Sequence, residues 1–399
     1  MNSQREQPRV IFFVSSFPAS SSGVLHSQVL SMVRFLSEQG FECLFIGSDV
    51  SVDKALASTK YIYEKYGVKA KILGIIHGKL GYPGFMLTAR NLYKASKDVI
   101  KSFRPTHIYS RSIIDSPIAR KIAKETGAIA IYDARAVISE EVKFRRGGRS
   151  LKYWYIRWVE MHEIDKATRL SCVSKMLKKY INSQGRKYDI RIVPSCLNNK
   201  NFYFSQSVRI EVRETYGLLK NHKLLCYSGG LAPWQRITDI IALFEKISML
   251  DSTFRFLFVT PDKWRIKKLL EQSLLKTERY FVESCAQQDV YKYLSAADAG
   301  VIMREDIIVN NVSSPIKIGE YLSCGLPVIM TRGIGDFSEL IPEAGVGMLL
   351  NNSLEDDAIK VVSFLKNLNV ESVRNQAISF SYKYYNFKSY ISEYKNLYS

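Results

Sequence analysis

The amino-acid sequence predicts an α/β protein built from two doubly wound, Rossmann-like domains. Short apolar runs alternate with longer amphipathic stretches along most of the 399 residues, a rhythm typical of strand–helix–strand units around a parallel sheet. The alternation restarts after residues 190–194, and the segment 194–203 (PSCLNNKNFY) is polar and contains a proline, as an interdomain connector would. A chain of this length also favours two or three domains, at roughly 100–200 residues per domain.

In the first half, continuous apolar runs predict buried strands, and apolar residues at helical spacing predict the helices between them. A loop rich in Ser and Gly (15–23) separates the first strand from the first helix, which Gly40 ends. The strands are expected at 10–14, 42–46, 107–109 and 128–132, and the helices at 29–36 and 116–126.

The second half repeats this pattern. Strands are expected at 223–227, 254–260, 280–282, 299–303 and 327–330, and helices at 235–249, 263–275, 288–296 and 315–324. The predicted domains are therefore 1–194 and 195–380. Such folds bind ligands beyond the carboxyl ends of their strands, so two facing domains would hold the ligand in the cleft between them.

Composition excludes several classes of protein. The chain is 46% hydrophobic and 24% charged, which is ordinary for a globular protein and excludes disordered or collagen-like architectures. The six cysteines are spread singly and the five histidines do not cluster, so no metal site is predicted and a reduced, cytosolic protein is expected. The first ten residues lack the apolar core of a signal peptide, and no apolar stretch reaches the 18 residues of a membrane span.

The net charge of +19 is distributed very unevenly. Lys and Arg outnumber Asp and Glu by 34 to 16 in residues 1–200, but only by 23 to 22 in residues 201–399, which suggests an anionic partner for the first half. Within it, residues 143–158 interleave basic and aromatic side chains, a composition that suits an anionic membrane surface. Stacking on single-stranded nucleic acid is one alternative, and a helix whose Trp154 and Trp158 pack inward is the other.

A glycine-rich turn at 227–235 (YSGGLAPWQ) follows one predicted strand and opens a helix. Gly229 and Gly230 would let the backbone approach a ligand closely, and the free N–H groups at the start of the helix would bind a phosphate. A tight turn without a ligand is the alternative. The glycine spacing does not fit the dinucleotide-binding fingerprint.

A second candidate lies at 313–329 (SSPIKIGEYLSCGLPVI). Ser313 or Ser314 is expected to cap the helix, with Pro315 in its first turn. Glu320 lies on this helix among apolar residues. A buried carboxylate needs hydrogen-bond donors, which the two vicinal hydroxyls of a ribose could supply; a glutamate that faces solvent is the alternative.

Together, in this order and separation, these two segments resemble the C-terminal domain of GT-B glycosyltransferases, specifically the retaining enzymes of glycosyltransferase family 4. The strand–glycine loop–helix of that family is similar to 224–245, its base-binding stretch to 281–298, and its E-Y-x-x-x-G-x-P-V-I helix to 320–329. The segment 193–202 and the first strand–loop–helix, with Gly23, extend the resemblance to nearly the whole chain.

The resemblance implies the GT-B fold, in which a final helix (381–399) crosses back to the N-terminal domain. It also implies a nucleotide-sugar donor linked to UDP or GDP, with no obligatory metal or other cofactor. The residues that it assigns to the donor are Gly229, Gly230, Gln235, Arg236, Val282, Ser314, Pro315, Ile316, Lys317 and Glu320.

Two departures from the family pattern affect this site. The family pairs two glutamates with seven residues between them, and Val312 stands at the first position, so Asn310 or Asn311 is expected to take over its contact with the donor sugar. The arginine and lysine of the family's glycine loop are also replaced here, by Gly230 and Gln235. Arg236 and Lys317 are expected to supply the lost charge.

In the first half, residues 131–136 (IYDARA) resemble a D-x-R-G motif of some family members. Asp133 and Arg135, together with Lys317, are the catalytic candidates, holding the donor sugar or an acceptor phosphate. Arg111 ends the preceding strand in a similar way. For both arginines, solvation at a strand end or a salt bridge to Asp133 or Asp115 is the alternative.

The leading hypothesis is a cytoplasmic glycosyltransferase, peripheral on the cytoplasmic face of the membrane. It would transfer a sugar, with retention, to a lipid-linked glycan acceptor in surface polysaccharide biosynthesis, with its basic N-terminal domain on the anionic inner leaflet. No nucleic acid is expected as a partner. An inactive, glycosyltransferase-like binding scaffold and a basic nucleic-acid-binding protein are the alternatives, whereas an epimerase would need paired acid–base residues that are not found.

Overall fold

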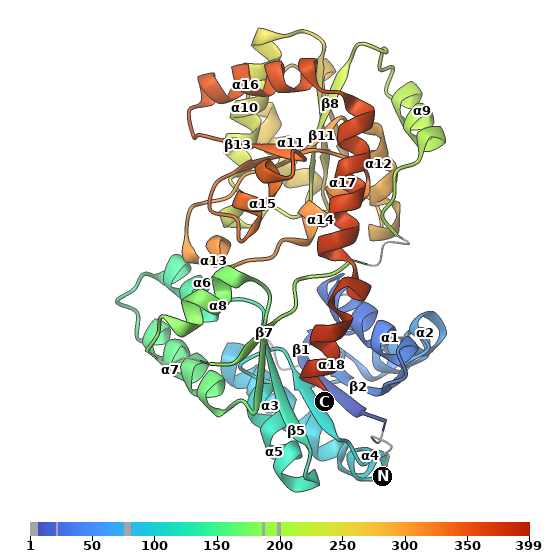
Figure 1. Cartoon of the computed structure of the whole chain (residues 1–399), viewed down its shortest axis with the longest axis vertical. Helices are drawn as coiled ribbons and strands as arrows, with labels where there is room; N and C mark the ends of the chain where they lie inside the picture. The colour runs from blue at the N-terminus through green and yellow to red at the C-terminus, as the bar shows by residue number, and fades with distance from the viewer. Residues whose placement is uncertain (1–6, 21–22, 76–80, 186–187, 198–200) are drawn as a thin grey trace. The chain divides into compact units, whose positions relative to one another are not determined.

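The structure, a computed structural model, describes residues 7–20, 23–75, 81–185, 188–197 and 201–399. The chain divides into two compact units, Met1–Pro194 with Tyr390–Ser399 and Ser195–Ser389 (Figure 1). Each unit contains one sheet whose strand pairings, within the described residues, are all parallel. This confirms the predicted α/β class. Residues 198–200 of the predicted connector lie outside the described residues.

The sheet of the first unit has seven strands in the order β3-β2-β1-β4-β5-β6-β7. Their bounds are β1 (Arg9–Pro18), β2 (Glu42–Ser48), β3 (Lys69–Leu73), β4 (His107–Ser110), β5 (Ile129–Ala134), β6 (Arg169–Cys172) and β7 (Ile190–Ile192). The expected loop at 15–23 is wrong in its first part, because β1 continues past a bulge until Pro18 pairs with Ser48 of β2.

Helices surround this sheet. They are a π-helical stretch, η1 (Leu25–Leu30), followed by α1 (Ser31–Glu38), α2 (Val52–Tyr66), α3 (Gly81–Ala95), α4 (Lys97–Phe103), α5 (Ser116–Thr126), α6 (Ile138–Arg146), α7 (Leu151–Lys166), α8 (Lys175–Asn182) and the C-terminal α18 (Ile391–Leu397). In α18, Tyr394, Leu397 and Tyr398 just beyond it are buried. Tyr398 packs edge-on against Phe41 and His107, with ring centroids 5.4 and 5.5 Å apart.

The sheet of the second unit has six strands in the order β10-β9-β8-β11-β12-β13. They are β8 (Lys223–Ser228), β9 (Phe254–Val259), β10 (Tyr280–Glu283), β11 (Ala299–Ile302), β12 (Val328–Thr331) and β13 (Gly347–Leu350). The helices are α9 (Gln206–Thr215), α10 (Ile237–Leu250), α11 (Lys263–Glu271), α12 (Val290–Ala296), α13 (Ile308–Asn311), α14 (Ile316–Ser323), α15 (Phe337–Glu343), α16 (Leu354–Asn367) and α17 (Val370–Tyr385). Short 3₁₀ turns are η3 (Pro233–Gln235), η4 (Thr277–Arg279), η5 (Gln287–Asp289) and η6 (Phe387–Tyr390).

Both faces of this second sheet are buried, which explains why its strands are continuous apolar runs. Along β8, Leu224 and Cys226 belong to one hydrophobic cluster, whereas Leu225 and Tyr227 belong to the cluster on the opposite face. The period of two residues follows from the alternation of side chains along a strand. The two clusters fix the sheet between its helices and hold the carboxyl ends of the strands in register.

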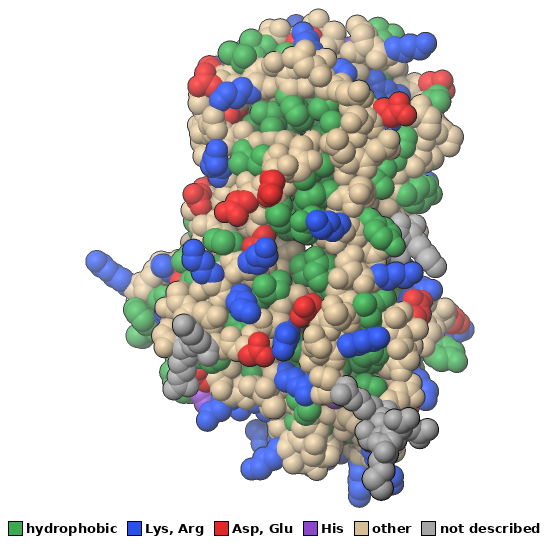
Figure 2. All heavy atoms as spheres, in the orientation of Figure 1, with side chains coloured by type: hydrophobic (Ala, Val, Ile, Leu, Met, Phe, Trp, Pro, Cys, Tyr) green, Lys and Arg blue, Asp and Glu red, His purple; other side chains and the backbone are tan. Residues whose placement is uncertain are grey.

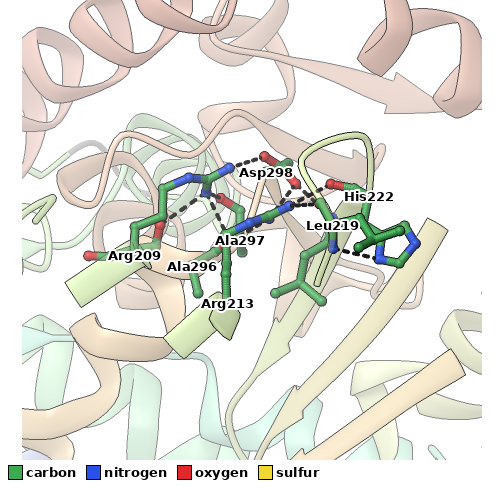
Figure 3. A network of polar contacts seen from close by, with 9 residues as sticks. Arg209, Arg213, Leu219, His222, Ala296, Ala297 and Asp298 are labelled. Atoms are coloured by element: carbon green, nitrogen blue, oxygen red, sulfur yellow. Dashed lines mark hydrogen bonds and ion pairs between the residues drawn. The ribbon is translucent and has the colours of Figure 1, made fainter. Parts of the chain in front are cut away.

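None of the residues of helix α9 is fully buried, and polar contacts help to attach it to this unit. Figure 3 shows Arg209 and Arg213 of α9 converging on Asp298, to which they donate over 2.6 and 3.3 Å. Asp298 also accepts a hydrogen bond from the backbone N–H of Leu224. The carboxylate of Asp298 therefore joins α9 to the start of β8, and within this unit its role is structural.

Candidate functional site

The candidate site lies at the carboxyl edge of the second sheet. The strand order reverses between β8 and β11, and open α/β sheets bind ligands outside such a reversal. Gly229 and Gly230 follow β8, Arg304 follows β11, and Lys317 and Glu320 lie in the first turns of α14. The fold thus brings the two sequence segments singled out above to one place.

Lys317 lies directly against the glycine turn. A Cβ on Gly229 would be 2.1 Å from Cε of Lys317 and 2.3 Å from its Nζ. The same ammonium group donates to the Tyr227 hydroxyl over 3.2 Å and lies 4.7 Å from the centroid of that ring. Gly229 also has a φ of 130°. Both the close approach and the backbone conformation therefore require glycine here.

Arg304 adds a second cation to the site, and it is buried. Its Nη1 lies 3.3 Å from Oδ1 of Asn310 and 3.3 Å from Oγ of Ser313, while its Nε is buried without a hydrogen-bond partner among the described residues. Within the same described set, no carboxylate lies within 4.0 Å of Arg304 or Lys317 to form an ion pair. The site therefore carries positive charge that the chain itself neutralises only in part.

Burial changes the acid–base properties of all three charged groups. Burial, reinforced by Arg304, lowers the pKa of Lys317 to about 7, and burial lowers the pKa of Arg304 to about 10. Burial raises the pKa of Glu320 to about 7, against the opposing effects of Lys317 and a hydrogen bond with Gln287. These are the directions expected when a charged form loses water, and an anionic ligand would favour the charged lysine.

The glycine turn offers fewer free N–H groups than its sequence indicates. The N–H of Gly229 donates to the Val259 carbonyl over 2.8 Å, so this N–H group is engaged within the unit. The helix after the turn also begins later than predicted: η3 (Pro233–Gln235) comes first, and α10 starts at Ile237.

Two of the predicted donor-binding side chains, Arg236 and Gln235, follow the two glycines and differ in their surroundings. Arg236 has a φ of 43° and precedes α10, where it pairs with Asp239 at 2.5 Å and donates to Asn352 over 2.7 Å. Asp239 therefore partly neutralises the charge of Arg236 within the unit. Gln235 is buried, and its Oε1 has no hydrogen-bond partner among the described residues.

The start of α14 also differs from the prediction. Pro315, not Ser313 or Ser314, is the N-cap, and it makes no side-chain capping bond, so the predicted serine cap is wrong. The hydroxyl of Ser314 instead accepts from the backbone N–H of Ser195 over 3.3 Å. Ile316 is the first helical residue, and Val282 lies buried in β10. Val312, where the resemblance expects a glutamate, is buried at the end of α13.

A second polar cluster lies at the carboxyl ends of β4 and β5 in the first unit. Asp133 is buried and accepts from Tyr109 over 2.5 Å and from Ser171 over 2.8 Å. Arg135 pairs with Asp133 at 3.0 Å and donates to the Val193 carbonyl over 2.7 Å. The salt bridge considered as the alternative for Arg135 is therefore present, and the oxygens of Asp133 are already engaged.

Arg111 lies beside this cluster and donates to Gln28. Burial and the neighbouring Arg135 lower its pKa to about 10. Its second possible partner, Asp115, is instead bonded to Ser15 and Ser112. Of these two neighbouring arginines, Arg135 pairs with Asp133, whereas Arg111 donates to Gln28.

The basic aromatic segment forms α6 and α7, and its tryptophans point outward. Trp154 and Trp158 are 57% and 64% exposed, so the interpretation in which both pack inward is wrong; Tyr153, Ile156 and Val159 fill the core instead. Figure 2 shows Lys and Arg side chains spread over the visible face of the first unit. In the described part of the chain, no helix has the length and apolar character to cross a bilayer.

Sequence reasoning missed Arg304, the most buried cation of the site. It follows an apolar run at 299–303, and a charged residue directly after a buried strand of a doubly wound sheet is the signal that could have identified it. Tyr227, which contacts Lys317, gave no comparable signal. Among the described residues, no group of three or more His, Cys, Asp or Glu side chains is placed to hold a metal ion.

Comparison with known proteins agrees with this architecture. Residues 208–383 match the family model for glycosyl transferases group 1, so the second unit carries a domain of that family. No curated protein matches the sequence.

Solved structures share the fold over almost the whole chain. Sucrose-phosphate synthase from Thermosynechococcus elongatus matches with a TM-score of 0.72 and 14% identity, over 98% of each chain. HepE of Anabaena in complex with UDP-glucose matches with a TM-score of 0.70 and 11% identity, and a glycosyltransferase from Rickettsia africae with 0.68 and 16%, again over 98% of each chain. These likenesses confirm the GT-B fold.

Proposed function

We propose that this protein is a retaining glycosyltransferase that takes its sugar from a nucleotide-sugar donor bound at the carboxyl edge of the second sheet. The observation that carries the proposal is that the site holds two cations, Lys317 and Arg304. Neither forms an ion pair with a carboxylate among the described residues. The glycosyl transferases group 1 domain and the UDP-glucose complex of HepE, a protein of the same fold, support it.

In this proposal the cations bind the diphosphate of the donor. Charge develops on the leaving phosphate as the bond to the sugar breaks, and fixed cations in a partly dehydrated site stabilise that charge strongly. Lys317 is only partly buried, and its ammonium group lies beside the glycine turn. Glu320, once ionised, accepts hydrogen bonds from two ribose hydroxyls, each worth about 1.5–3 kcal/mol.

The resemblance to glycosyltransferase family 4 extends the proposal to the chemical step. The C1–oxygen bond to the diphosphate breaks, the acceptor hydroxyl attacks the same face of the sugar, and its proton passes to the departing phosphate. Asn310 is already held by Arg304 and by the Glu305 carbonyl. Asn311, whose Oδ1 is buried without a hydrogen-bond partner among the described residues, is therefore the better substitute for the family glutamate that Val312 replaces.

Calorimetry with nucleoside diphosphates tests the donor site. UDP and GDP are titrated first, and the tighter ligand is then titrated into the Lys317→Ala variant. We expect a loss of affinity of roughly 10- to 150-fold, because a hydrogen bond to a charged group is worth about 1.5–3 kcal/mol. Lys267→Ala is the matched control, since Lys267 is exposed on α11 and lies outside the site.

A hydrolysis and transfer assay with the matching nucleotide sugar separates an enzyme from a binding scaffold. Slow hydrolysis of the matching nucleotide sugar without acceptor supports a transferase. Tight binding with no hydrolysis, and no transfer to any added glycan, supports the scaffold alternative, which the replacement of the first glutamate by Val312 favours. Failure of both diphosphates to bind, or equal affinity in Lys317→Ala, would contradict the donor site itself.

We further propose that the first unit binds the anionic cytoplasmic face of a membrane and so reaches a lipid-linked glycan acceptor used in surface polysaccharide synthesis. Leu151, Trp154, Tyr155 and Trp158 of α7 are all exposed, with Lys152 and Arg149 beside them. Aromatic rings at headgroup depth and cations on anionic lipid, at about 1 kcal/mol per Lys or Arg, give reversible attachment.

Vesicle sedimentation tests this surface. Vesicles with anionic phosphatidylglycerol should bind the protein more tightly than neutral ones, and the Trp154→Ser/Trp158→Ser variant should bind them roughly tenfold less, because apolar burial is lost. Trp264→Ser is a matched control: Trp264 is 73% exposed but belongs to the second unit. Equal binding by both variants would contradict the proposal, and tight binding to single-stranded RNA that vesicles do not displace would favour the nucleic-acid alternative.

A further inference from the structure

A cavity in the first unit lies at the edge of the sheet opposite to the carboxyl ends of its strands. Its volume is about 560 Å³, within the range of small-molecule pockets, roughly 300–1,000 Å³. Arg9, the first residue of β1, and the segment Arg104–Pro105 just before β4 form part of its wall. The cavity is therefore separated from the cluster of Asp133 and Arg135 by the length of the sheet.

Four cations line this cavity, and one carboxylate faces them. Arg9, Lys97, Lys101 and Arg104 are the cations. The carboxylate, Glu125, accepts the Tyr93 hydroxyl on both oxygens, at 2.8 and 2.6 Å, and lies 4.0 Å from Lys121 outside the cavity. In the part of the chain that the structure describes, Lys97, Lys101 and Arg104 form no ion pair with any carboxylate. The lining therefore has an excess of positive charge.

Arg104 adds an independent observation, because its backbone is strained. It ends α4 with φ 50° and ψ 62°, and it is one of only three non-glycine residues with positive φ among the described residues. Glycine or asparagine takes this position at a lower cost, and an L-residue there costs roughly 1–2 kcal/mol. Its carbonyl also accepts from Nε of Arg9 over 2.7 Å. This bond places the Arg9 guanidinium beside the backbone of Arg104.

We propose that this cavity binds a small phosphorylated metabolite, with its phosphate held by Lys97, Lys101 and Arg104. Phosphate oxygens are strong acceptors, and lysine and arginine are the side chains that bind them best. Ile100 and Pro105 are buried and give the cavity an apolar floor. This floor favours a phosphate ester with a compact organic body over inorganic phosphate. This inference does not depend on the proposed donor site.

Calorimetry with inorganic phosphate, pyrophosphate and glucose 6-phosphate tests the site, using the full chain in the Lys317→Ala background to silence the donor site. We expect binding that the Lys97→Gln/Lys101→Gln variant weakens at least roughly tenfold. Lys94→Gln/Lys124→Gln is the matched control: it removes the same charge from exposed positions on α3 and α5 that do not line the cavity.

Hydrogen exchange locates the bound ligand. Glucose 6-phosphate should slow exchange in peptides that cover residues 97–106 and leave those that cover 227–236 unchanged. Equal weakening in the two double variants would mean that only net charge attracts the anion, and this overturns the proposal. No binding of any of the three probes at millimolar concentration overturns it as well, whatever the outcome at the donor site.

Discussion

At the scale of single residues, the site depends on the absence of a side chain at Gly229. An alanine there would place its Cβ 2.1 Å from Cε of Lys317, at a φ of 130°. We expect Gly229→Ala to lower the free energy of unfolding by about 1–3 kcal/mol and to weaken nucleoside diphosphate binding at least tenfold, because Lys317 must move.

The neighbouring glycine provides the comparison for this prediction. Gly230 is not among the residues with positive φ, and a Cβ on it would meet only Oδ2 of Asp262, at 3.9 Å. Gly230→Ala should therefore leave stability within about 0.5 kcal/mol of the wild type. Denaturant titration and calorimetry of the two variants measure both quantities, and similar behaviour of the two would show that Lys317 does not depend on the close approach.

Lys317 also predicts how ligand binding responds to pH. Because burial lowers its pKa to about 7, a large fraction of Lys317 is uncharged in the free protein just above pH 7. A bound anionic diphosphate favours the charged form, so the pKa of Lys317 rises and the lysine gains a proton. Binding should then take up protons, and affinity should fall as the pH rises from about 7 to 9.

Calorimetry at pH 7.5 in two buffers of different ionisation enthalpy measures this proton uptake. The Lys317→Met variant, which keeps an unbranched side chain without the charge, should take up measurably fewer protons than the wild type. If proton uptake is unchanged in that variant, the assignment to Lys317 is untenable. Glu320, whose pKa burial raises to about 7, would then be the group that titrates.

At the scale of elements, the sequence identifies strands best where they are buried on both faces. The runs at 10–14, 223–227 and 254–260 are predicted because every position in the middle of these strands meets a core. Two of the missed strands, β3 and β13, lie at the edges of their sheets and are mostly only partly buried. An edge strand such as Lys69–Leu73 can therefore carry lysines, and its apolar signal disappears. A third missed strand, β6, lies inside its sheet and is mostly buried, but it is only four residues long and begins with Arg169, so its apolar run is too short to stand out.

In the candidate site, too, some residues could be predicted from the sequence and others could not. Glu320 and the two glycines could be found because a carboxylate within an apolar helix, or a glycine pair after a strand, conflicts with its local surroundings. The partners of Arg236 could not be found, because Asn352 is 116 residues away in the sequence and only the fold brings it close. The contact between Gly229 and Lys317 likewise depends on how α14 packs beside β8.

The attachment of α6 to α7 gives a testable case at this scale. Glu160 of α7 is buried and accepts from the N–H of Ile138 over 2.7 Å and from the Ser139 hydroxyl over 2.6 Å, at the N-terminus of α6. We expect Glu160→Ala to lower the free energy of unfolding by about 2–3 kcal/mol, because it leaves buried donors without an acceptor.

The pH dependence of stability provides the second measurement on Glu160. Burial raises its pKa to about 7 from 4.5, so the folded state binds more protons than the unfolded state between those values. This group therefore lowers stability as the pH rises from about 4.5 to 7. Glu160→Gln should remove this contribution from the slope of unfolding free energy against pH. Glu64→Gln, at an exposed position on α2, should leave the slope as in the wild type. A slope that is unchanged in Glu160→Gln would contradict the assignment.

At the scale of the whole molecule, the chain is two compact units with separate cores, and the charge follows the same division. Nearly all of the excess of Lys and Arg lies in residues 1–200, whereas the glycosyl transferases group 1 domain matches 208–383. Identities of only 11–16% to structures of the same fold indicate that the pattern of buried strands, rather than particular residues, defines the architecture.

The last ten residues belong to the first unit, and this predicts a stability effect confined to it. Tyr398 is 2% exposed and packs against Phe41 and His107, so Tyr398→Ala should lower the stability of the first unit by about 3–5 kcal/mol. Hydrogen exchange should accelerate in peptides from β1 and β4 and stay unchanged in those from β8 and β9, because the second unit has its own core. Tyr382→Ala, at a position 56% exposed on α17, should alter neither set; equal acceleration in both units would mean that the two unfold as one cooperative body.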